Sequence, residues 1–300
     1  MQIYFDNANL NSDSGPNSFA RKLFLQLTKM GYSCTAQPGN NIDVQLSFIS
    51  ICHHVAPTVL RLDGIWFNTA QDWKAANKPI QESYKNSKAI VLQSEFNKEL
   101  TEKYFGRHIN NYVINNGSDL KLMDKIKPLQ HAVFDGFNDV WCCASSWRPH
   151  KRLKSNIKYF LKHSNKNDCL VVAGSNPDYQ IKNDRIFYVG NLSQDVLFSL
   201  YKRSKYFIHL AFLDHCPNVV VDARAAGCKI ICASSGGTKE IAGSDALIVK
   251  DIDWDFKPLK LYEPPDLDLS SFIDNGYYTN IDIENVAARY ADVLTSITSR

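Results

Sequence analysis

Short apolar runs alternate along the chain with longer stretches in which apolar residues recur every three or four positions. The short runs are typical of buried strands and the periodic stretches of amphipathic helices. This alternation predicts βαβ units, mostly parallel sheets and right-handed crossovers. The expected strands are Gln2–Phe5, Val44–Ile49, Thr58–Leu62, Ala89–Gln93, Tyr112–Ile114, Val140–Ala144, Cys169–Ala173, Ile186–Val189, Tyr206–Leu210 and Lys229–Ala233. The expected helices are Asn17–Met30, Trp73–Lys85, Glu95–Tyr104, Arg152–Lys162, Gln194–Arg203, Asn218–Ala226 and Glu284–Thr298.

The alternation of strands and helices occurs twice. A first series runs to about Asn116, a second begins near Val140, and Gly117–Asn138 between them has weak periodicity. We therefore expect an α/β protein with two Rossmann-like domains, residues 1–138 and 139–280, followed by a helix at 281–300 that crosses back onto the first domain. A ligand is expected at the carboxyl ends of the strands, in the cleft between the domains.

Composition narrows the class of protein. Hydrophobic residues make up 44% and charged residues 22%, which is typical of a globular chain and excludes disordered or collagenous ones. The net charge of +3 argues against a nucleic-acid partner. The first residues lack the features of a signal peptide, and no apolar run is long enough to span a membrane. The eight cysteines contain no C-x-x-C pair, so we expect reduced thiols and a cytoplasmic location.

The segment from Tyr206 to Asp251 is the most informative. A strand leads to a polar turn with Asp214, and a helix begins after Pro217, includes Asp222 and ends before Gly227. A carboxylate there can accept hydrogen bonds from vicinal hydroxyls such as a ribose diol, and the helix start can face a diphosphate. Taken alone, the two aspartates are more simply interpreted as a solvated loop residue and a helix-surface charge.

This segment resembles the donor-binding region of the retaining glycosyltransferases of family 4, which have the GT-B fold. Their signature is Glu-x7-Glu, an Ala-x-x-Gly helix end, a strand and a Gly-Gly-x-x-Glu turn. The corresponding residues are Asp214-x7-Asp222, Ala223–Gly227 and Gly236-Gly237-Thr238-Lys239-Glu240. Both glutamates are replaced by aspartates, which keeps the charge and shortens the reach by one methylene.

The resemblance continues upstream. Ile186–Gly190 looks like the family's strand–glycine turn beside the nucleotide base, which places Val189 there. Ser145–Lys151 looks like its phosphate-binding loop, in which Lys151 matches the family lysine. The family's arginine position is Ser145, so the second cation is either Arg148 or Arg152. Fixed cations stabilise the charge that develops on a departing diphosphate.

The first half matches more loosely. Ser14–Asn17 occupies the place of the family's glycine-rich loop, so Gly15 is expected near the donor phosphates; an ordinary helix-capping turn is the alternative. Asp63 stands where the family has a histidine near the reacting sugar. It could equally be the first residue of an Asp-Gly turn.

The resemblance implies a metal-independent, retaining hexosyltransferase that needs no cofactor. It would move a sugar from a UDP- or GDP-sugar, bound by residues 139–280, to a hydroxyl of a glycan, lipid or protein on the side of residues 1–138. In the implied site, Asp222 holds the ribose, and Asp63 lies at the reacting centre. The diphosphate is bound by Lys151 and Arg148 together with the backbone at Asn218 and Val219. The sugar is bound by Asp214 together with the backbone at Gly237 and Thr238.

Alternative functions remain at this stage. A sugar-nucleotide epimerase can have the same fold, and a non-catalytic sugar-nucleotide-binding protein would retain the donor motifs. His53-His54 beside Cys52 lacks the spacing of a structural zinc site. The Asp-x-Asp pairs at 251–253 and 266–268 come too late in the chain for a donor-bound metal, so Asp251→Asn with Asp253→Asn is expected to leave the activity nearly unchanged. Nothing in the sequence supports a peripheral membrane contact.

Overall fold

The computed structural model describes residues 1–12 and 14–298, which divide into two compact units. The first unit contains Met1–Asp119, Phe256–Leu259 and the chain from Asn280 onward. The second contains Leu120–Asp255 and Lys260–Thr279. Residues 120–138, which the sequence assigned to the first domain, therefore group with the second unit.

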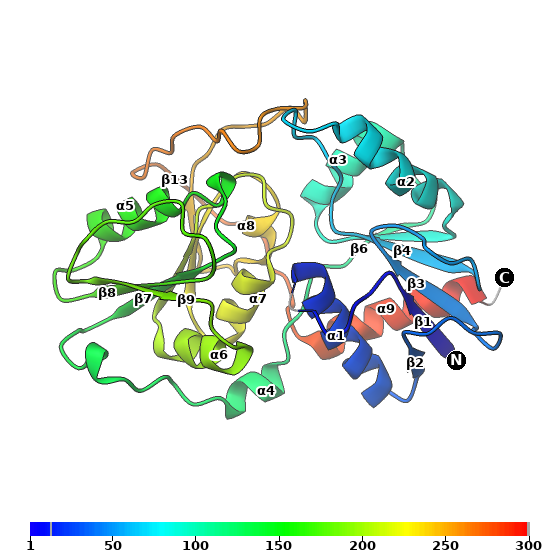
Figure 1. Cartoon of the computed structure of the whole chain (residues 1–300), viewed down its shortest axis with the longest axis horizontal. Coiled ribbons are helices and arrows are strands. Elements are labelled where there is room, and N and C mark those ends of the chain that lie inside the picture. The colour runs from blue at the N-terminus through cyan, green and yellow to red at the C-terminus, as the bar shows by residue number, and fades with distance from the viewer. Residues whose placement is uncertain (13, 299–300) are drawn as a thin grey trace. The chain divides into compact units, whose positions relative to one another are not determined.

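The first unit is built on a parallel sheet with the strand order β2-β1-β3-β4-β5-β6. Its central strands are buried along their whole length, because helices cover both faces of the sheet. Figure 1 shows α2 and α3 on one face and α1 and α9 on the other. The strands are β1 (Gln2–Asp6), β2 (Ser33–Thr35), β3 (Val44–Phe48), β4 (Thr58–Leu62), β5 (Ala89–Leu92) and β6 (Asn111–Val113). The helices are α1 (Gly15–Lys29), α2 (Trp73–Asn86), α3 (Glu95–Phe105) and α9 (Ile283–Thr298).

Side-chain caps explain where two of these helices begin. The Asp72 side chain accepts a hydrogen bond from the amide of Ala75 at the start of α2. The Ser94 hydroxyl does the same for Asn97 at the start of α3. Each cap satisfies an amide that has no partner inside its helix.

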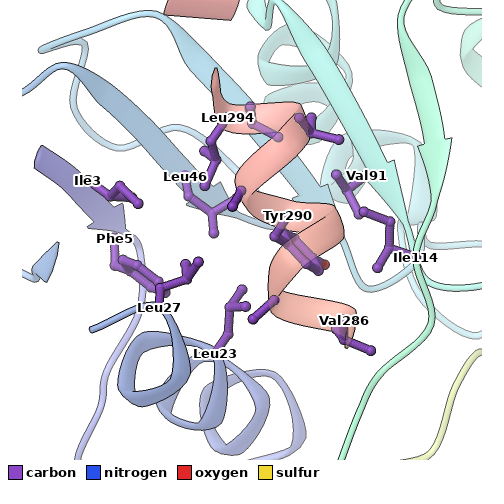
Figure 2. Close-up of a cluster of buried hydrophobic side chains, with 14 of the residues drawn as sticks. Ile3, Phe5, Leu23, Leu27, Leu46, Val91, Ile114, Val286, Tyr290 and Leu294 are labelled. Atoms are coloured by element: carbon purple, nitrogen blue, oxygen red, sulfur yellow. The ribbon is translucent and has the colours of Figure 1, made fainter. Parts of the chain in front are cut away.

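Helix α9 supplies part of the first unit's core, although it is 170 residues from β6 in sequence. Tyr290 and Leu294 are fully buried and pack with Leu46 and Leu23 (Figure 2). The Tyr290 ring lies 5.9 Å from that of Phe19 on α1. The hydrophobic face of α9 therefore closes one side of this core.

The second unit has a sheet with the order β13-β12-β11-β10-β7-β8-β9, parallel except for β13. Helix α5 lies on one face, and α6 and α7 lie on the other (Figure 1). The strands are β7 (Val140–Ala144), β8 (Cys169–Ala173), β9 (Ile186–Gly190), β10 (Tyr206–His209), β11 (Lys229–Ala233), β12 (Leu247–Val249) and β13 (Phe272–Ile273). The helices are α4 (Leu120–Lys125), α5 (Leu153–His163), α6 (Gln194–Arg203), α7 (Asn218–Ala225) and α8 (Thr238–Ile241), with short 3₁₀ turns η1 (Ala132–Phe134) and η2 (Pro149–Lys151).

The predicted α/β class with two parallel-sheet units is confirmed. Each predicted strand lies within two residues of an observed one; the sequence missed β2, β12 and β13, which have three residues or fewer. In the part of the chain that the structure describes, no helix is long and apolar enough to cross a membrane.

Candidate functional site

The site in the second unit lies where the strand order changes direction. From β7 the chain adds β8 and β9 on one side, and then returns to place β10 on the other side of β7. The loops that follow β7 and β10 therefore meet at the carboxyl edge of the sheet. Such switch points are where open α/β sheets bind ligands.

Lys151 and Asp214 come from these two loops and form an ion pair. Lys151 Nζ donates to Asp214 Oδ2 at 2.5 Å, and both side chains are mostly buried. His209 Nε2 lies 2.8 Å from the same oxygen, and the amide of His215 donates to Oδ1 at 3.1 Å. Burial raises the pKa of Asp214, but Lys151 and His209 outweigh it and hold that pKa well below its usual range. The carboxylate thus fixes the lysine at the sheet edge.

Arg152 is held away from this edge by a buried ion pair. Its guanidinium donates to both carboxylate oxygens of Asp251, at 2.6 and 3.3 Å, and to the carbonyl of Pro265 at 2.8 Å. The Ser235 hydroxyl also donates to Asp251, at 2.5 Å. Arg148 is exposed, and among residues 1–12 and 14–298 its guanidinium has no ion-pair or hydrogen-bond partner. Of the two candidate phosphate-binding arginines, Arg148 is therefore the one with a free side chain.

This ion pair also bears on an expectation from the sequence. Asp251 is buried and carries the charge that balances Arg152, so Asp251→Asn is expected to lower stability, a cost that the sequence did not indicate. It would leave a buried guanidinium without its counter-charge.

Two glycines let the backbone of neighbouring loops approach closely. A Cβ on Gly236 would lie 2.5 Å from the carbonyl oxygen of Asp214, and a Cβ on Gly174 would lie 1.8 Å from that of Ser145. Both glycines also have positive φ angles, 78° and 108°. The turn at Gly236 therefore supports the Asp214 loop directly, and the amide of Gly237 donates to the Asp214 carbonyl at 2.8 Å.

Helix α7 begins four residues after Asp214, with Pro217 as its N-cap. Asn218 and Val219 form its first turn and are partly exposed. Asp222 lies on the next turn and is buried. The positive end of the helix dipole is thus on the same loop as the Lys151–Asp214 pair.

Two histidines flank this pair, His150, which is buried, and His215, which is partly buried. Burial, followed by the charge of Lys151, lowers the pKa of His150 to about 3. Burial lowers the pKa of His215 to about 4. Both imidazoles are therefore neutral at physiological pH, and Lys151 is the cation among them.

The remaining predicted residues of this unit lie on other elements. Val189 is partly exposed on β9. Thr238 begins α8 and is buried; its hydroxyl has no hydrogen-bond partner within the described chain.

In the first unit, Asp63 directly follows β4 and joins a polar network. The buried guanidinium of Arg61 donates to Asp63 Oδ1 and, at 2.8 Å, to the Asn116 side chain. The Gln93 side chain donates to the same Asp63 oxygen at 2.6 Å. Gly15 is the first residue of α1 and is exposed. The guanidinium of Arg61 thus holds the Asp63 carboxylate in place, whereas Gly15 simply begins helix α1.

Comparison with known proteins finds a similarity in the second unit. Residues 138–256 match the family model described as "Glycosyl transferases group 1". This segment is therefore similar to the domains that this model describes. It contains Lys151, Asp214 and Asp222. No curated protein sequence matches the chain.

Solved structures show that the whole chain has the GT-B glycosyltransferase fold, as the sequence predicted. Sucrose-phosphate synthase from Thermosynechococcus elongatus has a TM-score of 0.69 at 11% identity, covering 100% of this chain and 99% of that one. HepE from Anabaena, solved in complex with UDP-glucose, has a TM-score of 0.69 at 12% identity, covering 99% of this chain and 100% of that one. A glycosyltransferase from Rickettsia africae has a TM-score of 0.63 at 13% identity, covering 99% of this chain and 98% of that one.

Sequence reasoning missed His209 and His150 in the second unit. His209 ends the apolar strand β10, where one polar residue carries no spacing signal. Its contact with Asp214 becomes visible only when the loop folds back over the strand end. His150 was interpreted only as part of the phosphate loop, and its contact with the ring of Tyr262, with ring centroids 5.3 Å apart, joins positions that are distant in sequence.

Proposed function

We propose that the protein is a metal-independent, retaining hexosyltransferase that moves a sugar from a nucleotide-diphosphate sugar to a hydroxyl acceptor. The single observation that carries the proposal is the ion pair between Lys151 and Asp214 at the switch point of the second unit's sheet. Asp214 lies on the loop that leads into α7. This arrangement offers an oriented cation and a helix start to an anionic ligand.

The diphosphate of the donor would lie against these groups. When the bond from the anomeric carbon to the diphosphate breaks, negative charge develops on the departing oxygen. Lys151, the exposed Arg148 and the amides at Asn218 and Val219 would stabilise that charge without a divalent cation. The expected gain is in the rate of transfer more than in ground-state binding.

The nucleoside would be held further along the same edge. Asp222 would accept two hydrogen bonds from the ribose diol, and Val189 on β9 would border the base. Asp214 would contact the sugar hydroxyls through the part of its carboxylate that Lys151 and His209 do not cover. UDP is the first nucleotide to test, because HepE was solved with UDP-glucose; GDP is the second. Gly15 and Asp63 stay predictions on the first unit.

The test is calorimetric titration of UDP, GDP, UDP-glucose and GDP-mannose in excess EDTA. Asp222→Asn removes the carboxylate charge and one of its two acceptor oxygens, so at least one charge-assisted hydrogen bond of about 1.5–3 kcal/mol is lost and nucleotide affinity should fall at least about tenfold. Asp222→Glu, which restores the family residue, should keep most of the affinity. Asp195→Asn, on the exposed start of α6, is the matched control.

Lys151→Ala should weaken UDP binding and leave binding of uncharged uridine unchanged. Equal UDP affinity in the wild type, Asp222→Asn and Lys151→Ala would exclude the proposed donor site. UDP-glucose turnover with and without added hydroxyl acceptors then separates transfer from epimerisation and from binding alone. A requirement for manganese would exclude the metal-independent mechanism.

A further inference from the structure

The first unit has its own switch point, between β1 and β3. From β1 the chain adds β2 on one side and then returns to place β3 on the other. Asp6 is the last residue of β1, and the irregular segment 49–57 follows β3 at the same edge. A ligand of this sheet is therefore expected beside Asp6 and this segment.

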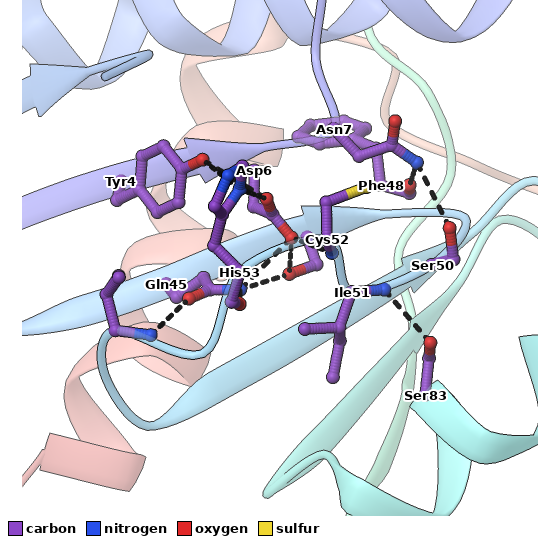
Figure 3. A network of polar contacts seen from close by, with 12 residues as sticks. Tyr4, Asp6, Asn7, Gln45, Phe48, Ser50, Ile51, Cys52, His53 and Ser83 are labelled. Atoms are coloured by element: carbon purple, nitrogen blue, oxygen red, sulfur yellow. Dashed lines mark hydrogen bonds and ion pairs between the residues drawn. The ribbon is translucent and has the colours of Figure 1, made fainter. Parts of the chain in front are cut away.

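Asp6 is fully buried and accepts hydrogen bonds from several donors (Figure 3). The Ser47 hydroxyl donates at 2.9 Å, the Cys52 amide at 2.8 Å and the Gln45 side chain at 3.1 Å, all to Oδ2. The Tyr4 hydroxyl donates to Oδ1 at 3.1 Å. Burial, followed by the charge of Asp6, raises the pKa of Tyr4 to about 12, so the phenol keeps its proton. These donors satisfy the buried carboxylate and orient it.

His53 is the partner that this network presents to solvent. Its Nδ1 lies 3.0 Å from Asp6 Oδ1 and 3.0 Å from the Tyr4 hydroxyl, while half of its side chain is exposed. A carboxylate oxygen can only accept, and the Tyr4 proton already points to Asp6, so Nδ1 of the neutral ring carries the hydrogen. Nε2 therefore bears a lone pair, and within residues 1–12 and 14–298 it has no hydrogen-bond partner.

The backbone around His53 is strained where both strands end. Asn7 follows β1 with φ 55°, and Ile49 follows β3 with φ 69°. A positive φ is costly for a β-branched residue such as isoleucine. The Asn7 side chain holds the two ends together by donating to the Phe48 carbonyl at 2.8 Å and to the Ser50 hydroxyl at 3.2 Å. Strain that is maintained in this way is characteristic of functional sites.

We propose that His53 Nε2 accepts a hydrogen bond from a hydroxyl of the saccharide or polyol acceptor, with Asp6 and Tyr4 as positioning residues. The ligand is a neutral hydroxyl compound because Nε2 offers a lone pair and the charge behind the ring is negative, which disfavours an anion. The described residues provide no group of three metal ligands here. The inference rests on the proposed transferase function, because it assigns the hydroxyl to the acceptor.

The experiment observes His53 directly in the full-length protein labelled with ¹⁵N-histidine. Methyl α-D-glucopyranoside, maltose and glycerol are titrated separately, and the imidazole nitrogens of His53 and His54 are followed by NMR. We expect the Nδ1-protonated form of His53 and a saturable shift of its Nε2 with at least one probe. His54, which is exposed and adjacent, should not shift.

The variants test the same contact by calorimetry with the probe that shifts His53. His53→Ala should weaken binding about fivefold, the value of one neutral hydrogen bond. His53→Gln should recover part of the loss, and His54→Ala should have no effect. Asp6→Asn should change the tautomer of His53. Because Asp6 is buried, this variant can fail to fold, and the variants of the exposed His53 and His54 then test the contact without it.

The proposal is overturned if no probe shifts His53 saturably, or if His53→Ala and His54→Ala bind the probe equally. UDP binding distinguishes this failure from failure of the proposed function. His53 lies outside the donor groups, so UDP affinity should be unchanged in His53→Ala. A wild-type protein that binds UDP but shows no response of His53 rejects this inference alone.

Discussion

At the scale of single residues, neighbouring basic side chains in the phosphate loop have different tasks. Lys151 points to Asp214 at the sheet edge, whereas Arg152 turns inward to Asp251. The backbone explains the difference, because Arg152 has a left-handed conformation, φ 51° and ψ 49°, between η2 and α5. This residue interrupts the helical run, so the side chains of Lys151 and Arg152 do not follow one helical face.

Replacing Arg152 should therefore affect stability, and replacing Arg148 should affect ligand binding. Arg152→Met leaves the Asp251 carboxylate buried without its partner, so the free energy of unfolding should fall by about 3–5 kcal/mol. Arg148→Met, at an exposed position, should change it by less than about 0.5 kcal/mol. Urea denaturation measures both. Equal stability of the two variants would contradict the structural role of Arg152.

His150 and His215 predict how stability depends on pH. An imidazole whose pKa is about 3 or 4 in the folded protein binds a proton more readily when unfolded, where its pKa is about 6.5. Their contribution is complete above pH 6.5 and is lost as the pH falls from there toward 4. Between pH 6.5 and 5, each of His150 and His215 should reduce the free energy of unfolding by about 2 kcal/mol.

The lowered pKa of Asp214 acts only at still lower pH, so it does not interfere in this interval. The measurement is urea denaturation at a series of pH values. Replacing both histidines by glutamine should reduce the slope of the profile between pH 6.5 and 5; the slope that remains is expected from His209, whose pKa burial also lowers. A wild-type profile that is flat in this interval would show that these imidazoles are protonated in the folded protein.

At the scale of elements, sequence reasoning succeeded where burial is complete. Strands such as Val140–Ala144 and Cys169–Ala173 are predicted to the residue, because a central parallel strand is covered on both faces and reads as one apolar run. Strand β2 (Ser33–Thr35) was missed because it lies at the edge of its sheet and has no apolar run. The donor motifs were found because their residues are close in sequence. The pairs Arg152–Asp251 and Asp6–His53 span 99 and 47 positions, which no local pattern reveals.

Helix α9 gives the prediction that belongs to this scale. Leu294 is fully buried in the core that α9 closes on the first unit. Leu294→Ala should lower the free energy of unfolding by about 2–5 kcal/mol through lost burial and a residual cavity. Leu25→Ala, at a half-exposed position of α1, is the matched control and should change it by less than about 0.5 kcal/mol. Urea denaturation of both variants tests whether α9 is part of the core.

At the scale of the whole molecule, each unit has a complete sheet of its own, but only one is nearly continuous in sequence. The first unit needs three separate parts of the chain, including α9. The second needs residues 120–279, from which only Phe256–Leu259 belongs to the other unit. A region with its own sheet and hydrophobic core can fold alone.

We therefore predict that a fragment of residues 120–279 folds cooperatively and binds UDP within about tenfold of the affinity of the full-length protein, a difference of about 1.4 kcal/mol. The physical reason is that the proposed nucleotide contacts, from Lys151 to Asp222, all belong to this unit. Circular dichroism measures the folding, and calorimetry with UDP measures the binding; the same fragment with Asp222→Asn is the control. A folded fragment that does not bind UDP would assign essential nucleotide contacts to the first unit, where Gly15 is the predicted candidate. A fragment that binds UDP regardless of Asp222 would instead reject the ribose assignment and leave the location of the site intact.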